Sequence, residues 1–351
     1  MAVRYVLFEA LVLALGVTAC SSDSNEGGAG SGGHAGSAGS AGAGGHAATG
    51  GSAGSGGRGG TGSGGSGGGG TTGANSGCPL FSSDDAWNAD VSGASVDAMR
   101  TAQLAALVGT AKIHPDFGPG FGIPINVVPA NQPAVLVTFD QYADESDPGP
   151  YAFPSSNDAR VEGTSDPANC DGDCHLITVQ QGTCTLFEGY ACHYDGGWVC
   201  GNGAKWDLTK RSYGQRPEGW TSVDAAGLPV YAGLARYEEF KSGEIKHAIR
   251  FTVKCTTDSH VPPATHDAVP GGCDPSSGPP MGQRVRLKAD FDISSFSSDA
   301  QVFLRAFKKY GMILADNGSN FFFQSEDHPD WPDGIDELKQ VPANAFEAVT
   351  P

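Results

Sequence analysis

Alternation of apolar and polar residues is the dominant pattern along the second half of the chain. Across residues 284–293 the odd positions are apolar and the even positions charged, which predicts a half-buried strand over the whole stretch. Strands are also predicted over 134–140, 174–180, 183–190, 203–208 and 244–254. Turn-forming runs, such as the Pro- and Gly-rich 147–150, separate these segments.

Helical spacing is confined to short segments. Phe303, Phe307 and Tyr310 share one face of a predicted helix over 299–310, which Ser298 and Gln301 begin as a capping box. A shorter helix is predicted over 234–241, and a strand over 311–316. Many strands at short spacing with few short helices favour an all-β dominated fold, a β-sandwich or jelly roll with long rim loops.

The N-terminal segment has the pattern of a lipoprotein signal. Arg4 precedes a short apolar run, and Val17-Thr18-Ala19-Cys20 has small residues before a cysteine. Residues 1–20 are therefore predicted to be a signal peptide, with Cys20 diacylated and anchored in a lipid bilayer. The apolar run is too short for a membrane-spanning helix. The alternative is an ordinary cleaved signal peptide with an incidental cysteine.

Residues 21–77 are predicted to be a disordered Gly/Ser-rich linker. They carry almost no apolar side chains, so nothing offsets the conformational entropy that ordering would remove. Residues 78–351 then form a single globular domain, which is long enough for a sizeable core. Because Ser21 and Ser22 supply no retention aspartate after Cys20, the chain is expected to be exported and anchored to the outer membrane or cell surface.

Charge narrows the possible partners. The chain has 39 acidic and 21 basic residues, a formal net charge of −18. This balance argues against nucleic acid as a partner and suits a soluble surface protein that binds neutral or cationic ligands. Outside the cytoplasm, ATP and nicotinamide cofactors are scarce, and no cofactor is predicted.

Eight cysteines follow Cys20, and an even number in an exported domain indicates disulfides. Cys192 and Cys200 flank a predicted hairpin turn at Asp195-Gly196, so they are expected to pair across it. Cys255 with Cys273 would close a Pro-rich loop, and Cys170 with Cys174 a tight one. The alternative is a zinc site built from Cys170, Cys174, His175, Cys192 and His193, although the chain has no CxxC pair.

The segment 243–251 places polar residues at unusual positions on a predicted strand. His247 lies in phase with apolar neighbours, while Glu244 and Arg250 lie on the opposite face. A buried histidine of this kind is either a core residue with satisfied hydrogen bonds or a general acid or base. Glu244, His247 and Arg250 are therefore candidate catalytic residues.

Asp173 and His175 would share a face at the start of the strand predicted over 174–180. They are candidate substrate-binding residues, or they belong to an ordinary turn. With Asp166 and Asp171 nearby, calcium is a further possibility, because hard cations bind clustered oxygen ligands, but the loop lacks EF-hand spacing.

Two more carboxylates lie on predicted strands. Glu188 is in phase with Cys184 and Leu186, and Asp207 follows Trp206. If either side chain points inward it needs a partner or a function. Both are candidate catalytic residues, and a solvated strand face is the alternative for each.

The segment 216–224 combines an aromatic residue with charges. Arg216, Trp220 and Asp224 have the composition of a sugar-binding surface, because apolar faces of sugar rings pack on indole. We take them as candidate substrate-binding residues. A core position is the alternative for Trp220, as it is for Trp198 and Trp206.

Several strings as a set resemble a family of secreted bacterial β-sandwich proteins across most of 120–350. They are Asp147–Tyr151, Gly172–His175, Arg216–Ser222, Gly243–Phe251 and Lys309–Gly318. The family usually has a basic residue between the Asp and His of the second string, where this chain has Cys174. The resemblance implies a β-sandwich of the kind common in carbohydrate-active proteins. It implies no particular reaction.

Two functions fit these observations. The first is a surface enzyme that cleaves extracellular polysaccharide. A hydrolase would use two of the carboxylates, and a lyase would use His247 as base with Arg250 neutralising a uronate. The second is a non-catalytic lipoprotein that binds glycans or has a structural role at the surface, in which Trp220 and Trp198 would matter more. Convergence of Glu188, Asp207, Glu244 and His247 in one cleft would favour the enzyme.

Overall fold

Fourteen strands in four sheets form most of the regular structure in the computed structural model, which describes residues 76–118 and 120–350. These residues belong to one compact unit, Ser66–Pro351. The predicted signal peptide, Cys20 and residues 21–75 of the predicted linker lie outside the described residues. The prediction of a mostly-β fold is confirmed, while the sandwich or jelly-roll arrangement stays a prediction.

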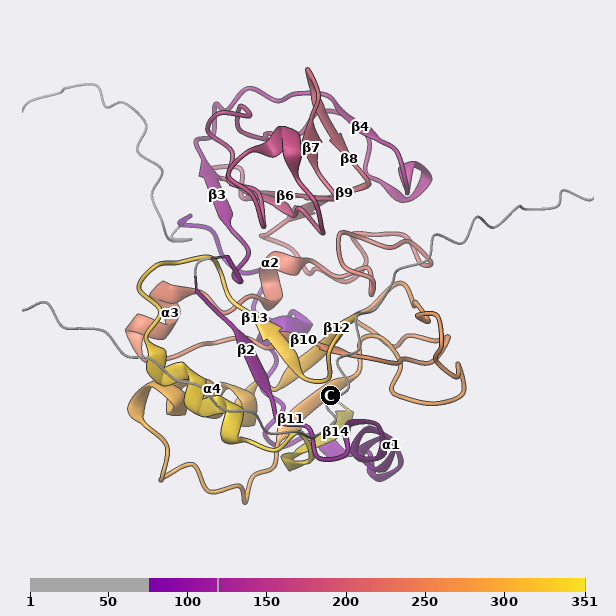
Figure 1. Ribbon diagram of the computed structural model, residues 1–351, viewed down its shortest axis with the longest axis vertical. Coiled ribbons are helices and arrows are strands. Elements are labelled where there is room, and N and C mark those ends of the chain that lie inside the picture. Colours follow the sequence, from indigo (N-terminus) through magenta and orange to yellow (C-terminus); the bar gives the residue numbers. More distant parts are fainter. Residues whose placement is uncertain (1–75, 119, 351) are drawn as a thin grey trace, which may run out of the picture. The chain divides into compact units, whose positions relative to one another are not determined.

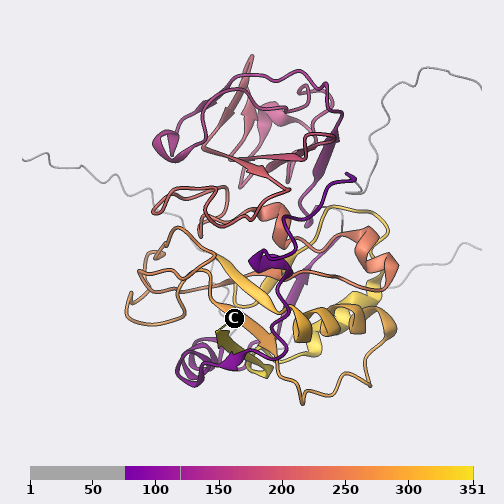
Figure 2. The ribbon, with the colours of Figure 1, turned by 180° about the vertical axis from the view of Figure 1, so that it is seen from behind.

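The largest sheet has five strands in the order β1-β14-β11-β12-β10 (Figure 1). Only β10 and β12 run parallel, and the other neighbours are antiparallel. The strands are β1 Ser95–Val96, β14 Phe346–Thr350, β11 Arg284–Leu287, β12 Met312–Asn317 and β10 Ile249–Val253. Helix α4, Ser298–Lys309, packs on this sheet at β11, as the view from behind shows (Figure 2). A parallel pair, β2 His114–Asp116 and β13 Phe322–Gln324, lies next to it.

A four-stranded sheet, in the order β3-β5-β6-β9, is buried on both faces. Its strands are Ile125–Val128, Leu176–Gln180, Thr185–Tyr190 and Asn202–Asp207. Ile177 and Leu186 point into the larger core, which also holds the side chains of the five-stranded sheet. Leu176 and Phe187 point into a smaller core, which includes Trp198 of a three-stranded sheet. That sheet, in the order β4-β8-β7, has strands Val137–Phe139, Trp198–Cys200 and His193–Tyr194.

Helices are few and short among the described residues. The α-helices besides α4 are α1 Ala98–Val108, α2 Val230–Gly233 and α3 Tyr237–Ser242. The 3₁₀ segments are η1 Ala86–Asn88, η2 Ala143–Glu145, η3 Pro167–Asn169, η4 Asp333–Gln340 and η5 Ala343–Ala345. Within the described ranges, no helix combines the length and the apolar character needed to cross a bilayer.

The strand predicted over 284–293 is wrong in extent and in exposure. Strand β11 ends at Leu287, and all four of its residues are buried. Arg286 is not on a solvent face: its guanidinium lies 2.9 Å from Glu347 and donates hydrogen bonds to two backbone carbonyls. The charged position at Arg286 is therefore buried and paired, while Asp290 and Asp292 lie beyond the strand and are exposed.

Helix α4 confirms the prediction over 299–310, although the capping residue differs. Ser297, not Ser298, accepts a hydrogen bond from the backbone N–H of Ala300. The shorter predicted helix begins three residues late, as α3. The sequence patterns missed α1, which Asp97 caps by accepting from the N–H of Arg100.

The three locally predicted disulfides are confirmed: Cys192–Cys200, Cys255–Cys273 and Cys170–Cys174. The fourth joins Cys78, at the start of the domain, to Cys184 just before β6. Because these sulfurs are in disulfides, the zinc alternative is wrong.

Candidate functional site

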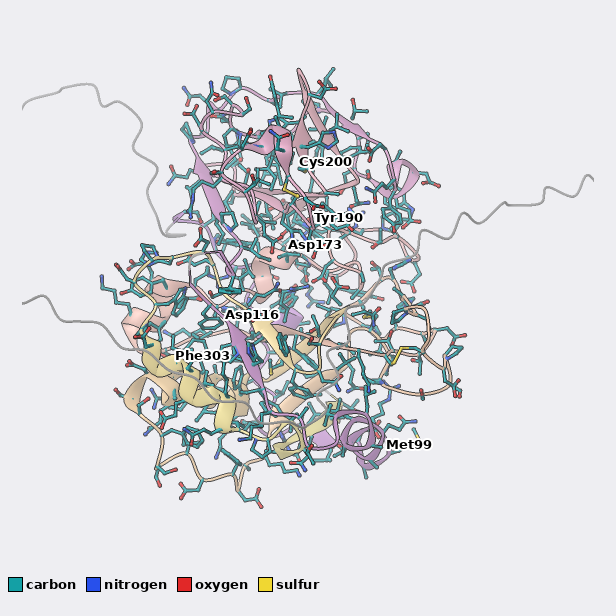
Figure 3. The ribbon with its side chains drawn as sticks, in the orientation of Figure 1. Met99, Asp116, Asp173, Tyr190, Cys200 and Phe303 are labelled. Atoms are coloured by element: carbon teal, nitrogen blue, oxygen red, sulfur yellow. A yellow bond between two sulfur atoms is a disulfide. The ribbon has the colours of Figure 1, made fainter. Side chains whose placement is uncertain are left out.

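A cavity of about 240 Å³, here called the Asp316 cavity, gathers polar side chains from distant parts of the chain. Asp173 and Tyr190, labelled in Figure 3, reach it from the four-stranded sheet: Tyr190 ends β6, and Asp173 comes just before β5. Strand β12 of the five-stranded sheet contributes Asp316 and Asn317. The rest of the lining consists of Tyr142, His175, Thr221 to Ala225, His266 and Ala268.

An ion pair fixes one wall of this cavity. Arg250, on β10, donates from Nε to Oδ2 of Asp224 at 3.0 Å and from Nη2 to Oδ1 at 2.7 Å. Both side chains are buried, at 4% and 0% exposure. Arg250 also donates to the side-chain oxygen of Gln324. This two-point geometry holds the Asp224 carboxylate in one orientation.

Asp316 lies against this pair, hydrogen-bonded to Asp224 and 3.6 Å from Nη2 of Arg250. A register shift between β10 and β12 sets its position. Phe251 pairs with Leu314, but Thr252 pairs with Asp316, so Ala315 is an extra residue in β12. Such bulges re-aim side chains, often next to active sites.

The pKa of Asp316 is raised to about 8, first by burial and then by the charge of Asp224, with Arg250 opposing. The carboxyl therefore keeps its proton at neutral pH. It remains 32% exposed at the cavity wall, so a molecule bound in the cavity can reach the carboxyl group.

His175 is held between two acceptors. Its Nδ1 lies 2.5 Å from Oε2 of Glu162, and its Nε2 lies 3.0 Å from the carbonyl oxygen of Val223. Burial lowers the pKa of this imidazole, but the Glu162 carboxylate outweighs burial and raises the pKa to about 9. Since both nitrogens face acceptors, His175 is an imidazolium that fixes the loop at Val223.

His266 offers different chemistry. Its Nδ1 lies 2.7 Å from the carbonyl oxygen of Ala225, so this nitrogen carries the proton of the neutral ring. The lone pair is then on Nε2, and no hydrogen bond joins Nε2 to another described residue. His266 lines the same cavity as Asp316, which brings a base and an acid to one site.

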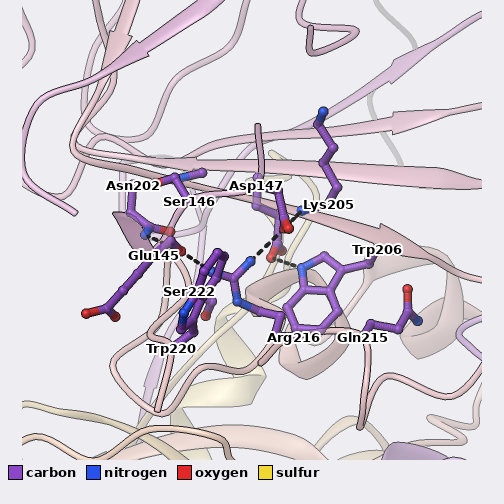
Figure 4. A network of polar contacts seen from close by, with 12 residues as sticks. Glu145, Ser146, Asp147, Asn202, Lys205, Trp206, Gln215, Arg216, Trp220 and Ser222 are labelled. Atoms are coloured by element: carbon purple, nitrogen blue, oxygen red, sulfur yellow. Dashed lines mark hydrogen bonds and ion pairs between the residues drawn. The ribbon is translucent and has the colours of Figure 1, made fainter. Parts of the chain in front are cut away.

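Arg216, predicted as a sugar-binding residue, instead holds the loop that carries Asp224. Figure 4 shows its guanidinium between the indoles of Trp206 and Trp220, with ring centres 5.8 and 5.5 Å away. It donates to the Asp147 carboxylate at 2.7 Å and to the Thr221 carbonyl oxygen at 2.9 Å. The half-buried Trp220 packs on this buried cation rather than lining the Asp316 cavity.

Glu188 is fully buried on the larger-core face of β6. Its carboxylate accepts from Trp206 Nε1 at 3.0 Å and from the backbone N–H of Tyr231, in α2, at 2.8 Å. Burial raises its pKa to about 7. These contacts link β6, β9 and α2, and Glu188 does not line the Asp316 cavity.

The other three predicted catalytic residues lie elsewhere. Asp207 forms a surface ion pair with Lys210 at 2.9 Å, and Glu244 is exposed. His247 is buried, with Nε2 2.9 Å from Glu239 and Nδ1 2.7 Å from the Ala248 carbonyl oxygen. The four candidates expected to converge therefore sit in four separate environments.

The calcium alternative gains no support from the described residues. Asp166 caps η3 by accepting from the N–H of Ala168 and from Asn169. Within 76–118 and 120–350, no group of three His, Cys, Asp or Glu side chains is arranged to hold a metal ion.

Of the residues that the sequence singled out separately, Asp173, His175 and Asp224 line this cavity and Arg250 lies beside it, whereas Asp316 and His266 were not singled out. One signal for Asp316 was present: the predicted strand over 311–316 ends its apolar run in a polar Asp-Asn pair. Comparison of the chain with protein-family models, curated proteins and solved structures gives no match.

Proposed function

We propose that the chain is a lipid-anchored surface enzyme that hydrolyses an extracellular polysaccharide, with Asp316 as the proton donor. The observation that carries the proposal is the Asp316 carboxyl on a cavity wall, against an Asp224 carboxylate that Arg250 binds at two points; burial and the charge of Asp224 raise the pKa of Asp316 to about 8. Cleavage of a glycosidic bond needs such an acid, because the leaving oxygen must take up a proton at neutral pH. The β-sandwich that the sequence resemblance implies is also common in carbohydrate-active proteins.

Asp224 is unsuited to be the second catalytic carboxylate. It touches Asp316, whereas glycoside hydrolases hold their two carboxyl groups about 5–9.5 Å apart. The groups that face the same space are Nε2 of His266 and the exposed Asp173. Either can take a proton from the attacking water, and single variants distinguish them.

Hydrolysis is favoured over the lyase alternative by the state of Arg250. In a lyase this side chain would neutralise a uronate, but here its charge is paired with Asp224 and its Nη1 donates to Gln324. The small volume, below the ~300–1,000 Å³ of most ligand pockets, suits one sugar ring more than a long chain.

The test uses the purified full chain on a panel of neutral, acidic and amino polysaccharides, with release of reducing ends as the readout. Asp316→Asn is expected to lower the rate about 100-fold or more while polysaccharide binding is kept. Asp330→Asn, at an exposed position, is the matched control and keeps full activity. Binding without turnover would favour the non-catalytic function, and unsaturated products absorbing in the ultraviolet would favour the lyase.

A further inference from the structure

A second cavity, of about 400 Å³, lies beside β2 and η4. None of its described lining residues belongs to the Asp316 cavity, and Asp116, which lines it, is labelled apart from Asp173 and Tyr190 in Figure 3. Its walls are aromatic: the Phe117 and Trp331 rings lie 4.8 Å apart between centres, tilted by 45°. We call it the Trp331 cavity.

Phe121 lies at this cavity with 66% of its surface exposed. Trp331, by contrast, is half-buried and packs on Tyr237 and Phe240 as well as Phe117. Trp331 is therefore partly packed into the core, whereas the exposed ring of Phe121 is an apolar surface open to the cavity. A large exposed aromatic side chain next to a hollow is typical of a ligand site.

Charge defines the ligand. Three acidic side chains, Asp116, Asp333 and Asp336, line the cavity, against Lys339, whose Nζ is 2.7 Å from Asp336, and His114. Burial raises the pKa of Asp116, although His114 lies 3.1 Å from its Oδ1. The described charges therefore leave a net negative site beside aromatic faces, and this combination attracts organic cations.

We propose that the Trp331 cavity binds the protonated amine of an amino-sugar unit. The aromatic wall takes the apolar face of the sugar ring, and Asp116 pairs with the ammonium group. This site is separate from the Asp316 cavity and does not depend on catalysis there. It would hold an amine-bearing glycan at the protein surface.

The test compares oligomers of glucosamine with N-acetylglucosamine oligomers of equal length, which differ in charge, by calorimetric titration. All measurements use the full chain carrying Asp316→Asn, so that turnover cannot interfere. The charged oligomer is expected to bind at least about tenfold more tightly, with affinity falling as salt is added. Equal affinity for the two oligomers would overturn the proposal.

Variants locate the binding. Phe121→Ala is expected to weaken it about two- to fivefold, and Asp116→Asn about tenfold. Leu136→Ala is the control, because Leu136 is 79% exposed outside the cavity. If Asp116→Asn fails to fold, Asp333→Asn at an exposed position replaces it. The site would be contradicted if Phe121→Ala and a carboxylate variant both bound the glucosamine oligomer as tightly as the parent protein. It would also be contradicted if spermidine bound as tightly as the glucosamine oligomer.

Discussion

Replacing Asp316 with asparagine changes how stability depends on pH. The folded protein holds the Asp316 proton with a pKa of about 8, against 3.8 for an unperturbed aspartate carboxyl. Between these values the folded state keeps a proton that the unfolded state has lost, so wild-type stability falls as pH rises through this window. The amide that replaces the carboxyl cannot ionise, and it can still donate a hydrogen bond to Asp224 in place of the carboxyl proton.

The size of this effect follows from the two pKa values of the Asp316 carboxyl, folded and unfolded. A pKa change from 3.8 to about 8 corresponds to almost 6 kcal/mol at ~1.4 kcal/mol per unit. Over the window from about pH 4.5 to about pH 8.5, the two pKa values give a change of about 4–5 kcal/mol in the free energy of unfolding. Relative to the variant, wild type should lose this amount between about pH 4.5 and about pH 8.5.

The assay is urea unfolding of the oxidised full chain at both pH values, with Asp330→Asn as the control. For each protein, the free energy of unfolding at one pH is subtracted from that at the other, and the two results are then compared. This comparison cancels the contributions of other titrating groups, such as Glu188. If the two proteins have parallel stability profiles across the window, the Asp316 carboxyl is not held protonated and the reasoning is refuted.

Three further changes have defined outcomes. Replacing Cys78 and Cys184 together with serine should lower the free energy of unfolding by about 4 kcal/mol, since the disulfide closes a separation of 106 residues, and an unchanged thermal midpoint would contradict this. Arg250→Met should cost about 3–5 kcal/mol in urea unfolding, because it leaves Asp224 buried without its cation; a midpoint equal to wild type would count against the pair. Glu244→Gln should change neither stability nor reducing-end release, because this side chain is exposed. Loss of activity in this variant would instead support Glu244 as a catalytic residue.

Alternation located three strands of the four-stranded sheet, β5, β6 and β9, because turn-forming residues bound each of them in the sequence, and it missed β3. It failed at β11, where Arg284 and Arg286 are buried. A period of two separates the faces of a strand but does not say which face meets water. In β11 the charged face is covered by other segments, and Glu347 of β14 pairs with Arg286.

Three of the residues that line the cavity could be found from single strings of sequence. Asp173 with His175, and Asp224 within its Arg- and Trp-containing loop, stood out as polar residues near turns. For Asp316 the polar end of the predicted strand was the only local signal, because its role comes from the parallel pairing of β12 with β10 and from the extra Ala315, which leave no pattern in the sequence. His266 was likewise hidden in a Pro-rich loop, where only the contact with Ala225 fixes its proton.

The central claim is that Asp316 donates a proton during polysaccharide cleavage. The most direct measurement is the initial rate of reducing-end release from about pH 5 to about pH 10, for wild type and for Asp316→Asn on the same substrate. The account predicts wild-type activity that falls on the alkaline side with an apparent pKa near 8, and a variant with almost no activity at any pH. A variant that cleaves as fast as wild type, or a wild-type rate that stays constant through pH 9, would contradict it.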